Sequence, residues 1–308
     1  MIWLLVLLAI VAAAPFVIEV LRPKVTDETR AQGEGQSATL SQGVTHYEWI
    51  GPLRGPVAVC VHGLTTPSFV WTGLAHGLAA WGYRVLIYDL YGRGLSDRPG
   101  GRQNRAFFIT QLNDLLDHEE VKTDITLFGY SMGSAVATAY AAAHPDRIRR
   151  LILLAPAGMQ RPQGILVRFI REVPLVGDWL FLTLFSNQHR RAVDAERDLP
   201  ASVPDIYDRT AAELKWRGFA PAVLSSLRGM LSEDLEADHR GFRAQDVPVV
   251  AIWGEADALI PLSAMGRLTE WSRHARQEVI PDAGHGLLYT HTDEILAALR
   301  STLADDPD

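Results

Sequence analysis

The chain has 308 residues, of which 48% are hydrophobic and 21% are charged, and its formal net charge at pH 7 is −7. This length is enough to bury a full hydrophobic core, as one large domain or as one domain with an insertion. The acidic balance argues against nucleic acid as a partner. The single cysteine, Cys60, excludes an intrachain disulfide, and no C-x-x-C or H-E-x-x-H motif indicates a metal site.

The chain begins with an uncharged apolar run over residues 2–18. Seventeen residues in a helix span about 26 Å, which is near the lower limit for crossing a bilayer. We therefore predict that residues 1–22 form a transmembrane helix, which makes the protein a single-pass membrane protein with an N-terminal anchor.

Two alternatives to the anchor remain open, a cleaved signal peptide and a buried core helix. The alanines at 12–14 resemble a cleavage site, although no basic residue precedes the apolar run. The basic residues Arg22, Lys24 and Arg30 follow the run, and they favour a cytoplasmic body by the positive-inside rule.

Residues 23–45 are polar and rich in glycine, which predicts a linker and not a domain. Beyond the linker, short apolar runs alternate with helical patterns. This rhythm is typical of an α/β fold with a mostly parallel, doubly wound sheet. The predicted strands lie at residues 46–50, 57–61, 84–88, 125–128, 148–154, 247–253 and 278–280.

The alternation stops between residues 159 and 243, where aromatic and aliphatic residues recur at helical spacing. We interpret this stretch as a helical cap, or lid, inserted between two halves of one sheet. Ligand sites favour such domain interfaces, so we expect the cap to border the site. A second helical domain unrelated to the site is the alternative.

The clearest chemical motif is Gly129-x-Ser131-x-Gly133, which lies between a predicted strand and a predicted helix. A nucleophilic serine on a sharp strand-to-helix turn needs small neighbours, because the strand and the helix approach each other closely. The helix that follows offers free backbone N–H groups and a positive dipole end. We therefore predict Ser131 as a catalytic nucleophile.

A serine hydroxyl needs a base, and the base needs a carboxylate that orients it. His285 follows the last predicted strand, between two glycines, and is the candidate base. Asp257 is the candidate acid because it follows a strand, as Ser131 does, while Asp282 and Glu255 are the alternatives. Because the base must be neutral, we expect activity to fall at acidic pH.

An oxyanion formed by attack of the serine needs two backbone donors. One should be the N–H of Met132, the residue after the nucleophile. The other should come from the loop after His62-Gly63, from the N–H of Leu64, and we expect His62 to brace that loop.

These pieces together resemble the α/β-hydrolase superfamily, specifically cap-bearing esterases, monoacylglycerol-lipase-like enzymes and C–C bond hydrolases. The resemblance implies an α/β-hydrolase core of residues 46–158 and 244–308. A serine nucleophile disfavours the dehalogenase and epoxide-hydrolase branches, which use aspartate. The matching segments are His62-Gly63, 89–96, 129–133, 254–261 and Gly284-His285.

We expect a membrane-bound serine hydrolase that cleaves a small hydrophobic carboxylic ester through an acyl-enzyme, with no cofactor and no metal. The alternatives are a C–C bond hydrolase, a perhydrolase or an acyltransferase that uses the same triad. A ligand-binding receptor with a vestigial triad is a further alternative from a different class of protein.

Overall fold

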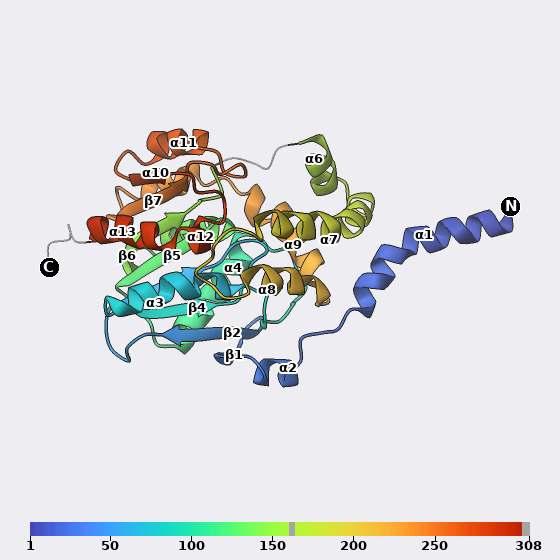
Figure 1. The fold of residues 1–308 in the computed structure, drawn as a ribbon, viewed down its shortest axis with the longest axis horizontal. Helices are drawn as coiled ribbons and strands as arrows, with labels where there is room; N and C mark the ends of the chain where they lie inside the picture. The colour runs from blue at the N-terminus through green and yellow to red at the C-terminus, as the bar shows by residue number, and fades with distance from the viewer. Residues whose placement is uncertain (160–163, 304–308) are drawn as a thin grey trace.

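The computed structural model describes residues 1–159 and 164–303, and its centre is one eight-stranded sheet (Figure 1). The strand order is β1-β2-β4-β3-β5-β6-β7-β8. β2 pairs antiparallel with β1 and β4, and the other neighbours pair in parallel, which confirms the mostly parallel sheet. The strands are β1 (Gln36–Leu40), β2 (Gly43–Ile50), β3 (Val57–Val61), β4 (Arg84–Tyr88), β5 (Ile125–Tyr130), β6 (Ile148–Leu154), β7 (Val249–Gly254) and β8 (Arg276–Ile280).

Helices cover both faces of this sheet, and the central strands are therefore apolar on both sides. Leu127 of β5 belongs to the hydrophobic core on one face, and its neighbour Phe128 belongs to the core on the other face. One face is covered by α3 (Thr72–Ala80), α12 (Leu287–Thr290) and α13 (Thr292–Leu303), and the other by α4 (Arg105–His118), α5 (Met132–Ala143), α10 (Glu236–Gly241) and α11 (Ser263–Trp271).

Between β6 and β7, the described residues form helices and no strand. Most of these helices share a small hydrophobic core, which includes Ile170, Phe181 and Phe219. We refer to residues 159–243 as the cap, of which 160–163 lie outside the described residues; α10, at its end, packs against α5 and α11. The cap elements before α10 are α6 (Ile165–Glu172), α7 (Val176–Glu196), α8 (Ile206–Ala212), η3 (Glu213–Lys215), α9 (Phe219–Arg228) and η4 (Met230–Ser232).

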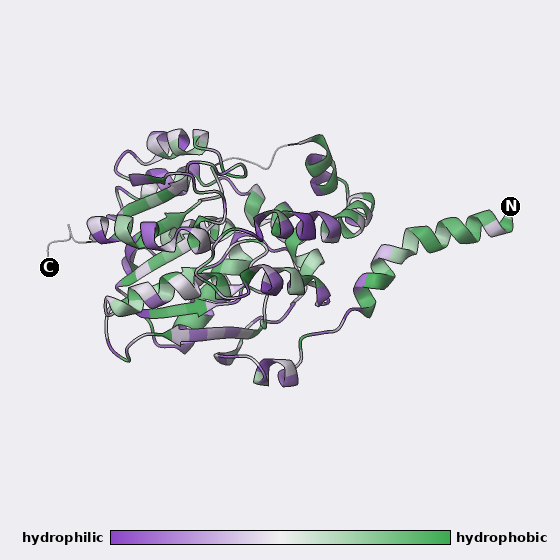
Figure 2. Cartoon of the chain, viewed as in Figure 1, coloured by the Kyte–Doolittle hydropathy of each residue, from purple (hydrophilic) through white to green (hydrophobic). Residues whose placement is uncertain are grey.

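The N-terminal apolar run forms one helix, α1 (Ile2–Leu21), which projects from the body beside the cap (Figure 1). Its mean hydropathy reaches 2.8, and it is long and apolar enough to cross a membrane. Only 6% of its apolar window is buried, and Figure 2 shows that it is hydrophobic almost throughout.

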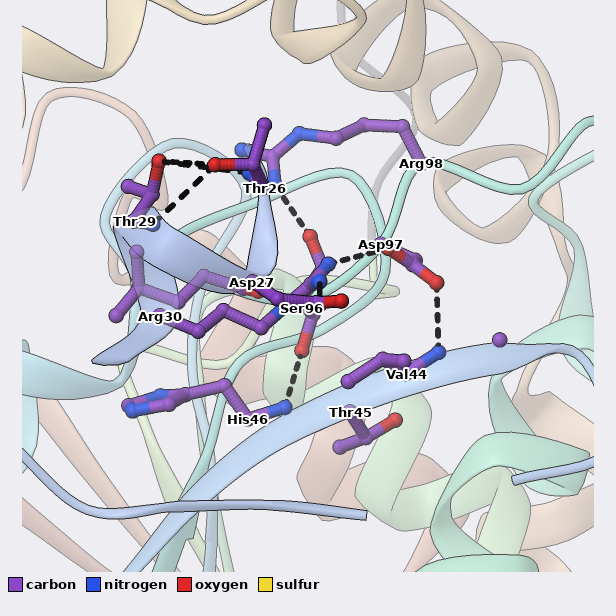
Figure 3. Close-up of polar contacts among 12 residues, drawn as sticks. Thr26, Asp27, Thr29, Arg30, Val44, Thr45, His46, Ser96, Asp97 and Arg98 are labelled. Carbon is purple, nitrogen blue, oxygen red and sulfur yellow. Dashed lines mark hydrogen bonds and ion pairs between the residues drawn. The ribbon is translucent and has the colours of Figure 1, made fainter. Parts of the chain in front are cut away.

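The predicted boundary between a linker over residues 23–45 and the core is wrong in the structure, because α2 (Asp27–Ala31), β1 and the start of β2 lie in this segment and β1 pairs with β2 in the sheet. α2 begins with a capping box between Thr26 and Thr29. Arg30 then binds the carboxylate of Asp97 (Figure 3). Its Nε donates to the carbonyl oxygen of Leu95 at 3.0 Å. These elements are short and polar, so their sequence lacks the apolar period by which longer elements are recognised.

Candidate active site

Ser131 is a turn of a single residue between β5 and α5. Its φ of 53° and ψ of −120° are unusual for a residue other than glycine, and such strain occurs at functional sites. The surrounding backbone holds this conformation. The Ser131 N–H donates to the carbonyl oxygen of Leu154 at 2.9 Å, and the Ser131 carbonyl oxygen accepts from the N–H of Ala157 at 3.2 Å.

The two glycines of the motif allow the close approach that this turn needs. A Cβ on Gly129 would lie 2.5 Å from the Cα of Ser134 and 2.6 Å from the carbonyl oxygen of Gly133. A Cβ on Gly133 would overlap the backbone of β3. The sequence pattern therefore has a steric reason in the fold.

The structure brings Ser131, His285 and Asp257 together. β5, β7 and β8 run parallel, so the loops at their carboxyl ends meet at one edge of the sheet. His285 Nε2 lies 2.9 Å from Ser131 Oγ, and His285 Nδ1 lies 2.8 Å from Asp257 Oδ2. Asp257 is buried, and its other oxygen accepts the N–H groups of Leu259 and Ile260, both at 2.8 Å. A proton can therefore pass from Ser131 to His285 while Asp257 orients the ring.

The two alternative acids, Asp282 and Glu255, lie elsewhere. Both are exposed, and the N–H of Asp282 donates to Glu255 Oε2 at 3.2 Å.

Tyr130 is a supporting residue that sequence reasoning missed. Its hydroxyl donates to the carbonyl oxygen of His285 at 2.9 Å, and the two rings lie 5.6 Å apart. An aromatic residue before the nucleophile is the only sequence signal for this contact.

The loop that carries the Leu64 amide lies directly beside Ser131. A Cβ on Gly63 would lie 3.3 Å from the Cβ of Ser131. His62 is fully buried and connects this loop to the chain after β4, because its Nε2 accepts from the N–H of Leu90 at 2.8 Å and its Nδ1–H donates to the Gly63 carbonyl oxygen at 2.8 Å. Burial lowers the pKa of His62 to about 4, so the ring is neutral at physiological pH.

Arg93 is a second supporting residue that sequence reasoning missed. Its guanidinium is fully buried, and burial lowers its pKa to about 9. Nε donates to the carbonyl oxygen of Leu64 at 3.0 Å, while one terminal nitrogen donates to Ser226 Oγ of α9 at 2.8 Å. The same guanidinium donates to Gln103 Oε1 at 2.5 Å. Arg93 thus connects the Leu64 loop to the cap.

Asp89, at the end of β4, organises the loop that contains Arg93. Its carboxylate accepts the N–H groups of Ser68 and Leu95, both at 2.8 Å, and pairs with His46 Nδ1 at 3.2 Å. Burial acts to raise the pKa of Asp89, but the hydrogen bond and the charge of His46 hold that pKa well below its usual range. The backbone N–H of His46 also donates to Ser96 Oγ at 2.9 Å (Figure 3).

Ser131 and His285 open into a cavity of about 670 Å³ between the sheet edge and the cap. This volume is within the usual range for small-molecule sites. The cap contributes Val167, Leu227 and Leu231 to its walls. The described lining residues include no arginine or lysine, and they are Leu64, Ser131, Pro156, Ala157, Met159, Val167, Leu227, Leu231, Ala258, Leu259, Ile260, Pro261, Ser263, Ala264 and His285. In the described chain, no group of three or more His, Cys, Asp or Glu side chains could hold a metal ion.

A family model described as the alpha/beta hydrolase fold matches residues 56–292. This match covers well over half of the sequence, and the strand order and the site geometry agree with it. The chain therefore belongs to the α/β-hydrolase family, as its motifs predict, and it is a hydrolase of that family.

Individual relatives differ in the reactions for which they are named. A cis-3-alkyl-4-alkyloxetan-2-one decarboxylase of Shewanella oneidensis is 25% identical over 289 residues, which are 86% of this chain and 87% of that protein. A 2-hydroxymuconate semialdehyde hydrolase of Pseudomonas putida is 26% identical over 231 residues, which are 72% of this chain and 77% of that protein. A thermophilic esterase from Thermogutta terrifontis has a similar fold, with a TM-score of 0.69 and 22% identity over 88% of this chain and 98% of that chain.

Proposed function

We propose that this protein is a serine hydrolase of hydrophobic carboxylic esters, held at a membrane by α1. The observation that carries the proposal is the chain of contacts from Asp257 through His285 to Ser131, which ends in an apolar cavity. Each of these residues has the chemistry and the spacing that nucleophilic catalysis requires.

In the first half of the reaction, Ser131 Oγ attacks the carbonyl carbon of the ester, and His285 Nε2 accepts the hydroxyl proton. Asp257 holds Nδ1–H of the ring and stabilises the imidazolium. The C–O bond to the alcohol then breaks, and His285 gives the proton to the departing oxygen. The acyl group remains on Ser131 as an ester.

In the second half, His285 takes a proton from water, and the water oxygen attacks the acyl carbon. The bond from this carbon to Ser131 Oγ then breaks, His285 returns the proton to Oγ, and the carboxylic acid leaves. Both halves pass through an oxyanion, for which the N–H groups of Leu64 and Met132 are the proposed donors. Met132 is the first residue of α5, where a backbone N–H has no acceptor within the helix. Loss of one such donor typically costs about 3 kcal/mol of barrier.

The cavity supports a hydrophobic, uncharged substrate. Its walls are mainly apolar side chains from the core and the cap, and a buried anion there would need a cationic partner that the described lining lacks. The Shewanella relative is named for an oxetanone with two alkyl groups, which is a cyclic ester. This name agrees with an apolar ester site.

The exposure of α1 supports a membrane anchor over a core helix. A core helix hides its apolar side chains, whereas Ile2, Trp3 and Leu21 of α1 are each at least 73% exposed. A bilayer would cover these side chains.

The test is turnover of a p-nitrophenyl ester series, from short to long acyl chains, by the full chain in detergent micelles. The matched control is Ser131→Ala. We expect activity that the variant lacks and a chain-length optimum set by the cavity. Equal rates for both proteins on every ester would overturn the proposal.

C–C bond hydrolysis is the second candidate, because the Pseudomonas relative is named for that class of substrate and is 26% identical. Its named substrate is a muconate derivative, and a carboxylate fits poorly into a cavity whose described walls hold no arginine or lysine. Product analysis with a neutral diketone and with an ester of similar size separates the two reactions.

A further inference from the structure

The end of α1 is joined to the cap by several polar contacts. Glu19 is buried, and its Oε1 accepts the N–H of Gly218 at 2.6 Å. Arg22 donates to Ser186 Oγ of α7 at 3.2 Å. A helix that enters a bilayer would therefore fix the position of the cap relative to that bilayer.

A contact further along α1 brings the start of α7 beside the middle of this helix. Trp179 Nε1 donates to the carbonyl oxygen of Val11 at 3.2 Å. Val11 precedes Glu19 by eight residues, or about 12 Å of helix. If α1 lies in a bilayer, the first turn of α7 must therefore lie at the level of the bilayer as well.

Exposed apolar residues lie at the start of α7 and in α6, which packs against α7. They form what we term the α6–α7 patch. Outside residues 1–21, the only other large hydrophobic side chains of the described residues that are exposed to this degree are Leu53, Leu199 and Leu259. The patch consists of Ile165 (92% exposed), Leu166 (46%), Phe169 (40%), Leu175 (75%) and Val176 (54%). Figure 2 shows α6 on the same side of the molecule as the hydrophobic α1.

The opposite side of α6 faces the candidate active site. Val167 lines the cavity that contains Ser131, and Ile170 packs into the small core of the cap. The apolar residues of α6 therefore extend from the exposed patch to the cavity and the cap core, while Arg168, Arg171 and Glu172 form the remaining, charged side of the helix. This single helix separates the exposed patch from the cavity.

We propose that the α6–α7 patch lies in the interfacial layer of the bilayer that α1 enters. We further propose, on the basis of the proposed ester hydrolysis, that a lipid-soluble ester passes from this layer beside α6 into the cavity. The position of the patch follows from its continuity with α1 through the Trp179–Val11 contact. Burial of the five side chains in lipid removes exposed apolar surface from water.

The position of the patch is tested with spin labels on the full chain in phosphatidylcholine vesicles. Cys60 is the only native cysteine and is fully buried, so the variants Ile165→Cys and Leu175→Cys each add one accessible thiol. Leu53→Cys is the matched control, because Leu53 is also 92% exposed but lies in the loop between β2 and β3. The background from labelling of Cys60 is measured on the native chain, which carries no added cysteine.

We expect labels at 165 and 175 to collide more with oxygen, which concentrates in lipid, than with a water-soluble nickel chelate. The label at 53 should show the opposite preference. Labels at 165 and 175 that behave like the label at 53 would overturn the membrane placement, whatever the chain does to esters.

The passage of substrate is tested with the double variant Ile165→Asp/Leu175→Asp. We expect its kcat/KM for a long-chain ester dissolved in vesicles to fall at least tenfold, with hydrolysis of water-soluble p-nitrophenyl acetate unchanged. Equal loss on both esters, or no loss on either, would overturn the passage. A native chain that hydrolyses neither ester would instead contradict the proposed function.

Discussion

Arg93 donates a hydrogen bond of 3.0 Å from Nε to the carbonyl oxygen of Leu64, whose own N–H is a proposed oxyanion donor. The same guanidinium binds Ser226 in the cap. The loop beside Ser131 and the cap are therefore held by one side chain, and the geometry of the oxyanion site depends on where the cap lies.

We predict that Arg93→Met lowers kcat by about 10- to 100-fold and changes KM less. This loss is smaller than the loss expected when an oxyanion donor is removed outright, because the Leu64 amide is displaced and not deleted. Arg93 acts through Leu64, so it is a positioning residue. Affinity for an alkyl boronic acid, whose adduct on Ser131 puts an oxygen in the oxyanion site, should fall by a similar factor. Arg102→Met, at an exposed arginine, is the control. Unchanged boronate affinity in a folded variant contradicts this role.

We predict that Asp257→Asn lowers kcat by about 10³- to 10⁴-fold, since an amide cannot fix the ring tautomer or stabilise the imidazolium. The Asn oxygen can still accept the N–H groups of Leu259 and Ile260, so the fold should persist. Steady-state kinetics and circular dichroism check both statements. Asp282→Asn, at the exposed alternative acid, should retain native activity, and a comparable loss there would reassign the acid.

We predict that Gly129→Ala destabilises the protein by about 2 kcal/mol or more, because its Cβ would meet backbone atoms at 2.5–2.6 Å. The variant should also lose activity under conditions where it remains folded, because the displaced backbone carries Ser131. The control is Gly266→Ala in α11, where a Cβ meets no atom within 4 Å. Denaturant unfolding of both variants, followed by tryptophan fluorescence, gives the comparison, and equal stabilities would contradict the steric argument.

Glu213 of the cap provides a prediction about pH. Burial raises the pKa of Glu213 to about 7, and its Oε2 accepts the N–H of Gly94 at 2.9 Å. Between the ordinary value of 4.5 and about 7, the folded chain binds more protons at this site than the unfolded chain. The contribution of Glu213 to the free energy of unfolding therefore decreases as pH rises through this window.

Glu213→Gln keeps the acceptor oxygen and cannot ionise. We predict that, relative to the native chain, this variant gains up to about 3 kcal/mol of stability between pH 5 and pH 8. Unfolding in denaturant at the two pH values measures the difference. Glu172→Gln, at an exposed residue of α6, should show no such change. A Glu213→Gln variant that tracks the native chain at both pH values would refute the assignment.

The sequence predicts that Ser131, Asp257 and His285 lie together, as the structure shows, because the signals for their positions are local. The glycines around Ser131 reflect contacts between adjacent elements, and the strands before Asp257 and His285 place both at one sheet edge. The role of Arg93 could not be predicted in this way, because its partner Ser226 lies 133 residues further along the sequence and only the folded cap brings the two together. α2 could not be predicted for the opposite reason, because its five residues, four of them polar, carry too little pattern to distinguish a helix from a loop.

The attachment of α2 has a consequence for the kinetics. Arg30 binds the Leu95 carbonyl oxygen and the Asp97 carboxylate, and the Pro23 carbonyl oxygen accepts the N–H of Arg217. The segment that joins α1 to the sheet is therefore bound to the body and does not act as a free linker. With α1 in a bilayer, the cavity would keep one height and one orientation above the lipid. Encounters with a dissolved ester then occur in two dimensions. Addition of inert lipid should slow turnover, whereas dilution of the vesicles with buffer should leave it unchanged.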